Sequence, residues 1–281
     1  MCSREPLNRK SVIDLQTMRL LPHSLPFLSN DRYDCRLART QEEICRGQHL
    51  RFEVFNLELG EGLSSSYLHQ RDQDPFDAVC DHMILVDRMS GEVVGTYRMQ
   101  SGDTAEEAFG YVSEQAFDFS PFERVRSASL ELGRACLHPD HRHYQALSLL
   151  WKGILRYANK RAMRYLLGCS SVHGLDIQQG HAIYEALKKS HLAPEAFQTT
   201  PHFETQLPFM DWESVTPKIP KLLRCYLSLG AKICGRPSMD ESFGTIDFLT
   251  LLDLKDLSLN IQQRFLGTES VHGNAIASKL G

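Results

Sequence analysis

Apolar and polar residues alternate most clearly near the middle of the chain. Leu130 and Leu132 alternate with Glu131 and Gly133, which is the period of a β-strand that buries one face. Pro139 ends this alternation, and apolar residues then recur at helical spacing at Leu147, Leu150, Trp151 and Ile154. The pattern predicts a strand, a turn and a helix. The amino-terminus of this helix, with its unpaired N–H groups, should lie near the carboxyl end of the strand and favour phosphate.

The same two periods predict the other elements. Alternation predicts strands over residues 33–38, 82–86, 92–99, 165–169 and 245–254. Helical spacing and capping residues predict helices over residues 40–59, 176–190, 217–230 and 256–265. Two segments, residues 63–75 and 101–126, show no period and are expected to be loops, the second with aromatic side chains for a lining or lid.

Strands and helices interleave along the whole chain, which favours one α/β domain over two. We assign this domain to residues 31–266, with an amino-terminal arm at residues 1–30 and a polar tail at residues 267–281. In the first predicted helix, Leu50, Val54 and Leu57 are expected to form the buried stripe. Arg51 and Phe55, four positions apart, share an adjoining stripe.

Composition excludes several classes of function. The 31 basic and 35 acidic residues give a net charge of −4, so no general field attracts nucleic acid or an anionic membrane. The eight cysteines form no CxxC pair, which favours free thiols in a reducing cytoplasm over a disulfide framework. No apolar run reaches the roughly 18 residues typical of a membrane span. We expect a cytoplasmic protein without a nucleic-acid partner.

Glu131 places a carboxylate on the strand face opposite the leucines, and two interpretations stay open. A half-buried carboxylate near a cleft is a candidate general base, because desolvation raises its affinity for a proton. It can equally be one half of a structural salt bridge. Arg134, three residues on, would point to the other face unless the strand carries a bulge or sharp twist. A bulge would free a backbone N–H for an oxyanion.

The run Glu131-Leu-Gly-Arg134-Ala-Cys-Leu-His-Pro-Asp140, followed by a helix with leucines and a tryptophan, resembles the central motif of a bacterial enzyme family. These are the ornithine–acyl carrier protein N-acyltransferases, which make the lyso form of ornithine lipids. They belong to the Gcn5-related N-acyltransferase (GNAT) superfamily and share a core with the acyl-homoserine-lactone synthases. Further resemblance, in the family's order, lies at residues 50–55, 76–82, 95–98, 166–170, 222–232 and 243–248.

This resemblance implies a GNAT-type central mixed β-sheet flanked by helices. It also implies transfer of a (3-hydroxy)fatty acyl group from an acyl carrier protein to the α-amine of an amino acid, ornithine in most of the family. Glu131 would be the base, and Arg134 would hold it and shape the acyl pocket. The positions that would surround donor and acceptor are Arg51, Phe55, Asp77, Asp81 and Arg98. The aspartates suit the ammonium groups and Arg98 or Arg51 the carboxylate, although the reverse assignment stays open.

One departure concerns the donor. The superfamily binds coenzyme A pyrophosphate with a glycine-containing loop, whereas the run from Arg142 and His143 to Leu147 has no glycine. The phosphopantetheine arm of a carrier protein presents one phosphodiester, which favours the carrier over coenzyme A, with Arg142 and His143 at its phosphate. Basic residues that could form a docking patch, or simply a solvated helix face, are Arg142, Lys152, Arg156, Lys160, Arg161 and Arg164.

The chemistry expected is direct transfer without a cofactor or metal, since His138, His141 and His143 fit no standard ligand spacing. A two-step route through Cys136 is the alternative, but no neighbour lowers its pKa. Two other functions stay open. One is a synthase of acyl-homoserine-lactone or other N-acyl amino acid signals, and the other is a non-catalytic module that binds the carrier. A peripheral contact with the inner membrane is compatible with each.

Overall fold

The computed structural model describes residues 28–202 and 205–266. Most of the expected amino-terminal arm and the whole expected tail therefore lie outside the described residues. The last residues of that arm, Leu28–Ser29, form a short edge strand that pairs with Tyr33–Leu37. The boundary expected at residue 30 is therefore wrong, because the sheet begins before it.

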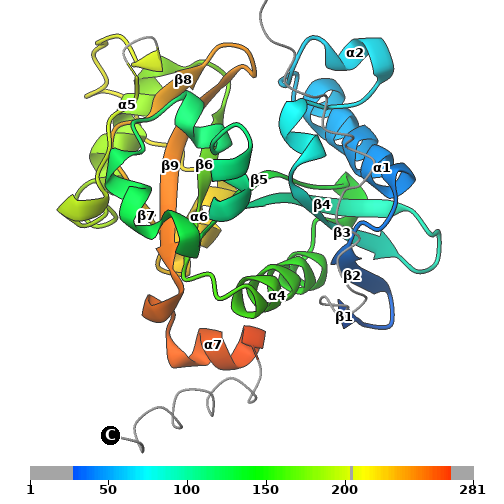
Figure 1. The fold of residues 1–281 in the computed structure, drawn as a ribbon. Coiled ribbons are helices and arrows are strands. Elements are labelled where there is room, and N and C mark those ends of the chain that lie inside the picture. Colours follow the sequence, from blue (N-terminus) through cyan, green and yellow to red (C-terminus); the bar gives the residue numbers. More distant parts are fainter. Residues whose placement is uncertain (1–27, 203–204, 267–281) are drawn as a thin grey trace, which may run out of the picture.

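One mixed sheet runs through the described part of the chain (Figure 1). Its strand order is β1-β2-β3-β4-β5-β6-β9-β7, and β8 also pairs with β9. Adjacent strands are antiparallel except β5 and β6, which are parallel. The strands are β1 (Leu28–Ser29), β2 (Tyr33–Leu37), β3 (Asp81–Asp87), β4 (Val93–Ser101), β5 (Ser129–Leu137), β6 (Tyr165–His173), β7 (Lys232–Ile233), β8 (Ser238–Asp240) and β9 (Thr245–Asp253).

Helices cover both faces of this sheet. The α-helices are α1 (Gln41–Phe52), α2 (Ser66–His69), α3 (Gly102–Glu107), α4 (Tyr144–Lys160), α5 (Ile177–Leu187), α6 (Lys221–Ser228) and α7 (Leu259–Leu266). A π-helix, Glu53–Glu58, continues α1. The 3-10 helices are Pro75–Ala78, Val112–Gln115, Ser120–Ala128, Pro139–His141, Glu195–Phe197 and Leu254–Asp256.

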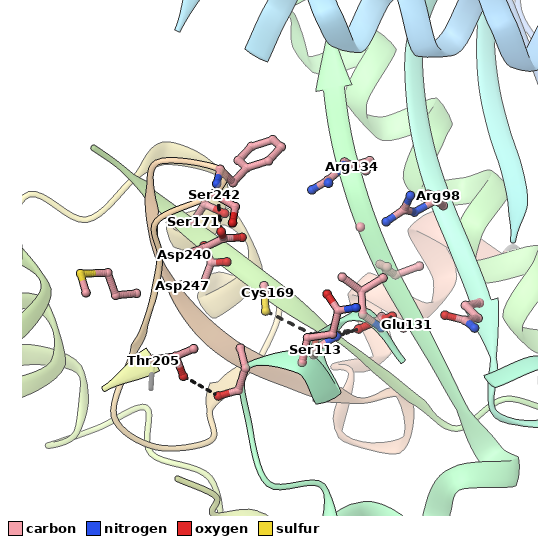
Figure 2. A pocket seen from close by; sticks show the side chains of 18 of the residues that line it. Arg98, Ser113, Glu131, Arg134, Cys169, Ser171, Thr205, Asp240, Ser242 and Asp247 are labelled. Carbon is pink, nitrogen blue, oxygen red and sulfur yellow. Dashed lines mark hydrogen bonds between the residues drawn. The ribbon is translucent and has the colours of Figure 1, made fainter. Parts of the chain in front are cut away.

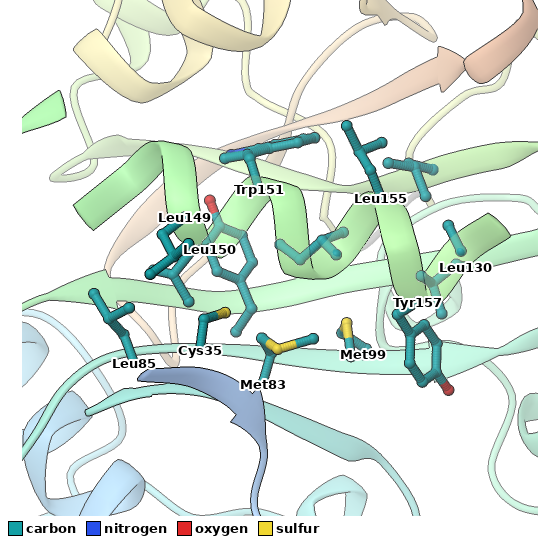
Figure 3. Close-up of a cluster of buried hydrophobic side chains, with 14 of the residues drawn as sticks. Cys35, Met83, Leu85, Met99, Leu130, Leu149, Leu150, Trp151, Leu155 and Tyr157 are labelled. Carbon is teal, nitrogen blue, oxygen red and sulfur yellow. The ribbon is translucent and has the colours of Figure 1, made fainter. Parts of the chain in front are cut away.

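The predicted strand, turn and helix at the centre of the chain are confirmed as β5, a 3-10 turn and α4. The apolar stripe of α4 packs on β2–β5, where Leu150 and Ile154 belong to one buried cluster with Met83 and Leu130 (Figure 3). The Trp151 ring lies against Tyr97 and Tyr226 instead. On the other face, α1 and the π-helix bury Leu50 and Val54 against Ile84, the neighbour of Met83. Successive residues of β3 thus face different layers, as the pleat of a strand requires.

Strands β5 and β6 separate after a short parallel contact. They pair only from Ser129 and Tyr165 to Glu131 and Leu167, and beyond that β5 follows β4 while β6 follows β9. Gly168 stands where they part, with a φ of +157°. A Cβ there would lie 2.2 Å from the carbonyl oxygen of Leu132. Only glycine permits this close approach.

Three sequence predictions are wrong in detail. Leu57 is 60% exposed, because the wider turns of the π-helix rotate it away from the stripe that holds Leu50 and Val54. Residues 101–126 are not a loop but contain α3 and two 3-10 helices. Their aromatic side chains do not form a lid, since all but Phe109 are buried against β6 and β9. The helix expected from residue 217 begins at Lys221, directly after Pro220.

Replacing Gly168 with alanine tests whether the parting of β5 and β6 depends on this close approach. We expect Gly168→Ala to lower the free energy of unfolding by about 2–4 kcal/mol, because it combines a strained φ with a main-chain clash. Gly133→Ala is the matched control on β5, since its Cβ would meet open space, and it should change stability by less than about 0.5 kcal/mol. Urea titrations of both variants measure the difference, and equal midpoints would contradict the assignment.

Candidate active site

A bulge in β5 brings Glu131 and Arg134 to one site. On β4 and β5, Arg98 pairs with Gly133, and the next pair is Thr96 with Cys136. One residue of β4, Tyr97, therefore lies opposite two residues of β5, Arg134 and Ala135. Arg134 takes a left-handed conformation with a φ of +48°. The bulge expected from the three-residue spacing is therefore present, and it leaves main-chain groups outside the ladder.

The carboxylate of Glu131 is buried and fixed by hydrogen bonds. The backbone N–H groups of Val112 and Ser113 donate to it at 2.8 Å each, and the Ser113 hydroxyl donates at 2.6 Å. These donors begin the 3-10 helix Val112–Gln115. Burial raises the pKa of Glu131 above its ordinary value, although these hydrogen bonds oppose the shift. Because a carboxylate has about four acceptor sites, three bonds leave one for a ligand.

Arg134 does not pair with Glu131, contrary to the role that the resemblance implies. Its guanidinium lies 3.2 Å from Asp72 and 3.3 Å from Asp74, and 4.4 Å from the ring centre of Phe243. In the described part of the chain, Glu131 forms no ion pair. The alternative of a Glu131 salt bridge is therefore wrong for this structure.

Two more arginines complete a buried charge cluster with the aspartates that precede β3. Arg51 is fully buried and contacts Asp72 at 2.7 Å and Asp77 at 2.9 Å. Arg98 contacts Asp74 at 2.6 Å. Burial alone would raise the pKa of Asp77, but the guanidinium groups of Arg51 and Arg98 hold it below its ordinary value. We call Arg51, Arg98, Arg134, Asp72, Asp74 and Asp77 the charge cluster.

Sequence reasoning missed Asp72 and Asp74, which lie in the segment without a period. The pair Asp74-Pro75 could have indicated the start of a helix here, since Asp74 is its N-cap and accepts a hydrogen bond from the backbone N–H of Phe76. It also misplaced Asp81, whose carboxylate accepts a hydrogen bond from Tyr157 and lies 3.5 Å from Arg161. Asp81 faces α4 at the start of β3, on the other side from the charge cluster, so its assignment to the substrate site is wrong.

Two cavities meet at the β5 bulge. The larger, about 930 Å³, opens between β5 and β6, and its inner wall is apolar where Leu132, Leu147, Trp151 and Leu252 line it. The smaller, about 380 Å³, holds Glu131 and Arg98 (Figure 2). Residues that line both are Leu132, Gly133, Arg134, Cys169, Ser171 and Phe243. A long apolar group in one cavity and a small polar molecule in the other would therefore meet beside the bulge.

The remaining expected site residues divide between these cavities and the protein interior. Phe55 lines the larger cavity and packs edge-on against Phe243, 5.4 Å between ring centres. Arg51, Asp77 and Asp81 line neither cavity. Arg142 and His143 line the larger cavity at the start of α4. Arg142 pairs with Glu58 at 2.5 Å, and His143 lies 2.9 Å from the Tyr33 hydroxyl.

Neither a metal site nor a membrane span is found among the described residues. No group of three or more histidine, cysteine, aspartate or glutamate side chains there could hold an ion. None of the helices in residues 28–202 and 205–266 has the length and apolar character needed to cross a bilayer.

Removing one member of the charge cluster should destabilise the fold, because it leaves buried carboxylates without a counter-charge. We expect Arg51→Met to cost about 3–5 kcal/mol of unfolding free energy. Arg46→Met is the control on the same helix: Arg46 pairs with Glu42 at the surface, so its loss should cost less than about 1 kcal/mol. Urea unfolding measures both, and a similar cost for the two variants would contradict a buried, charge-compensated cluster.

The described fold matches a known domain family. Residues 50–152 match the family model for the acetyltransferase (GNAT) domain. Among solved structures, the acyl-homoserine-lactone synthase LasI aligns over 84% of this chain and 95% of its own, with a TM-score of 0.48 and 12% identity.

Sequence relatives cover most of the chain. An L-ornithine N(alpha)-acyltransferase of Brucella abortus is 32% identical over 241 residues, which are 80% of this chain and 85% of that protein. One of Rhodobacter capsulatus is 31% identical over 237 residues, 80% of this chain and 92% of that protein. With the bulged strand, the buried glutamate and the paired cavities, this likeness leads to one conclusion: the chain is an acyltransferase and belongs to the L-ornithine N(alpha)-acyltransferase family of GNAT proteins.

Proposed function

We propose that this acyltransferase moves a fatty acyl group, 3-hydroxylated in the family's usual reaction, from the thioester of an acyl carrier protein to the α-amine of L-ornithine. The relatives from Brucella abortus and Rhodobacter capsulatus, both L-ornithine N(alpha)-acyltransferases, support ornithine as the acceptor. One observation supports the reaction most strongly: Glu131, with one acceptor site free, lines the smaller cavity where it meets the larger, apolar one. Such a reaction would be the first step of ornithine-type aminolipid synthesis.

In the proposed mechanism, the acyl chain occupies the larger cavity and its carbonyl lies at the bulge. Glu131 takes a proton from the α-ammonium, and the raised pKa of a buried carboxylate suits this role. The amine attacks the carbonyl carbon, and a main-chain N–H at the bulge stabilises the oxyanion. The C–N bond forms and the C–S bond breaks; the nitrogen gives its second proton to the departing thiolate, and Glu131 releases the first to solvent. These steps need no cofactor or metal.

Arg134 and Arg98 are placed to receive the acceptor's carboxylate, since both line the smaller cavity. Arg134 is the more accessible, with 17% of its side chain exposed against 3% for Arg98. A route through an acyl-cysteine at Cys136 is less favourable. Burial raises the pKa of this thiol to about 12, so the nucleophilic thiolate would be scarce at neutral pH.

An acyl carrier protein as donor is supported by the start and exposed face of α4. Arg142 and His143 line the mouth of the larger cavity, within reach of a phosphodiester. Further along α4, Arg156 is exposed and Lys152 half-buried, and neither forms an ion pair with another described residue. Arg142, Arg161 and Arg164 are instead paired with Glu58, Asp81 and Asp253. The free cations suit an acidic carrier.

We place the reaction in the cytoplasm, with peripheral contact at the inner membrane. The proposed product joins a long apolar chain to an amino acid and would partition into a bilayer. Two large side chains that line the larger cavity are also exposed, Leu59 at 36% and Tyr144 at 57%. They offer one surface for such contact.

The proposed reaction is tested by assaying Glu131→Gln with acyl carrier protein thioester and L-ornithine. We expect N-acylornithine formation to fall by about two to four orders of magnitude, because glutamine keeps the shape but cannot take the proton. Glu123→Gln, an exposed carboxylate paired with Arg126, is the control and should keep full activity. Mass spectrometry of the product distinguishes an open amide from a lactone, and parallel assays with acyl-coenzyme A identify the donor. Near-normal turnover of Glu131→Gln would overturn the mechanism.

A further inference from the structure

The smaller cavity has an acidic wall that the proposed mechanism does not use. Asp240 ends β8 and Asp247 lies on the adjacent strand β9, and both line the cavity. Figure 2 shows this pair on the side opposite Arg98 and Arg134, with Glu131 away from both aspartates. The cavity thus has a cationic side and two separate carboxylate positions.

Asp247 is a buried carboxylate without a cationic partner. It is 9% exposed, and among the described residues no Lys, Arg or His lies within ion-pair distance of it. Its Oδ1 accepts a hydrogen bond from the Thr245 hydroxyl at 3.1 Å. The aspartates of the charge cluster differ, since each of them contacts an arginine. A buried carboxylate without a counter-charge is costly unless a ligand supplies one.

Asp240 adds a second carboxylate to the same wall. Its Oδ1 accepts from the backbone N–H of Phe243 at 2.9 Å, and its side chain forms no ion pair with another described residue. Burial, with the nearby charge of Asp240 as a further cause, raises the pKa of Asp247 to about 6. Two carboxylates with spare acceptor sites therefore face the cavity, and no cation of the described residues lies within ion-pair distance of either; the charge of Arg134 acts on Asp247 only from farther away.

An independent observation at the Glu131 end also indicates a ligand rich in N–H groups. Gln100 pairs with Glu131 across β4 and β5, lines the same cavity and is only 2% exposed. Its Nε2 donates to the carbonyl oxygen of Gly110 at 3.1 Å. Its Oε1 has no hydrogen-bond partner among the described residues, so a buried acceptor is left over beside the proposed base.

We infer that this cavity selects an α-amino acid with a second ammonium group on its side chain, which Asp247 and Asp240 bind while the α-amine lies at Glu131. This inference rests on the proposed function and adds to it a specificity site. Cys169 lies between the two ends in Figure 2, with its sulfur 3.4 Å from the Ser113 hydroxyl that bonds Glu131. An extended diamino acid would bridge these ends across Cys169.

This arrangement also determines which nitrogen is acylated. A ligand whose side-chain ammonium pairs with Asp247 and whose carboxylate faces Arg134 has only its α-amine left for Glu131. An amino acid with an apolar side chain would leave both aspartates without a counter-charge, and the site would reject it for that reason.

The test compares L-ornithine with L-norvaline, which has the same carbon chain without the side-chain amine. With one acyl donor, the wild-type enzyme should have a kcat/KM at least about 100-fold higher for ornithine. Asp247→Asn should lower kcat/KM for ornithine about 10- to 100-fold and should raise that for norvaline, because the neutral amide no longer needs a counter-charge from the ligand. Asp256→Asn, an exposed carboxylate just beyond β9, is the matched control and should keep the wild-type ratio.

The outcomes separate this inference from the proposed function. If the wild type acylates other amino acids but not ornithine, the proposed acceptor is wrong. If the wild type prefers ornithine and Asp247→Asn retains the ornithine-to-norvaline ratio, the acidic wall is not the specificity site. Asp247→Asn should melt no lower than wild type at pH 8, because the wild-type carboxylate is charged and buried above about pH 6. If it does not fold, half-buried Asp240→Asn must reduce the same ratio, or the inference fails.

Discussion

The separation of β5 from β6 is the constraint on which the rest of the structure depends. Two parallel strands that remained paired would close the sheet, whereas these part after Glu131 and Leu167. Gly168 permits this because its missing side chain lets Leu132 approach closely. The larger cavity occupies the resulting opening, and α4 begins beside it. A donor with a long chain can enter the sheet from one side without disturbing the core that α4 covers.

The bulge in β5 lies beside this opening and directs two charged side chains to different partners. It rotates Arg134 toward the charge cluster while Glu131, three residues earlier, keeps its place against the helix start at Val112. Each charged group near the bulge has a partner that holds it: amides and a hydroxyl for Glu131, and aspartates for the arginines. Asp247 stands apart, because no cation of the described chain neutralises it. Charged groups that have a partner within the protein maintain the site, whereas a charged group without one, such as Asp247, is left for a ligand.

Local patterns were sufficient to predict β5, its proline-ended turn and α4, because these elements are adjacent in sequence and strongly periodic. The resemblance named Phe55, Arg98, Glu131 and Arg134, and each of these lines one or both of the cavities that meet at the bulge. The partners of these residues could not be predicted, since they come from segments without a period. Glu131 is held by residues 18 and 19 positions earlier, and Asp72 contacts Arg51 from 21 positions away. Asp81 was misplaced because the residues before β3 form a 3-10 turn whose direction no pattern reveals. One feature of the sequence could have indicated a functional role for Asp247, because it places a carboxylate within a strongly apolar strand.

The central claim is that the acyl donor and the amino acid occupy different cavities and meet at the β5 bulge. A crystal structure with L-ornithine and a stable thioether analogue of acyl-phosphopantetheine would test it most directly. We expect the acyl chain between β5 and β6, the α-nitrogen within hydrogen-bond distance of Glu131 directly or through one water, and the side-chain nitrogen at Asp247. Density for both ligands in one cavity, or for the amino acid outside the cavity that holds Glu131, would contradict it.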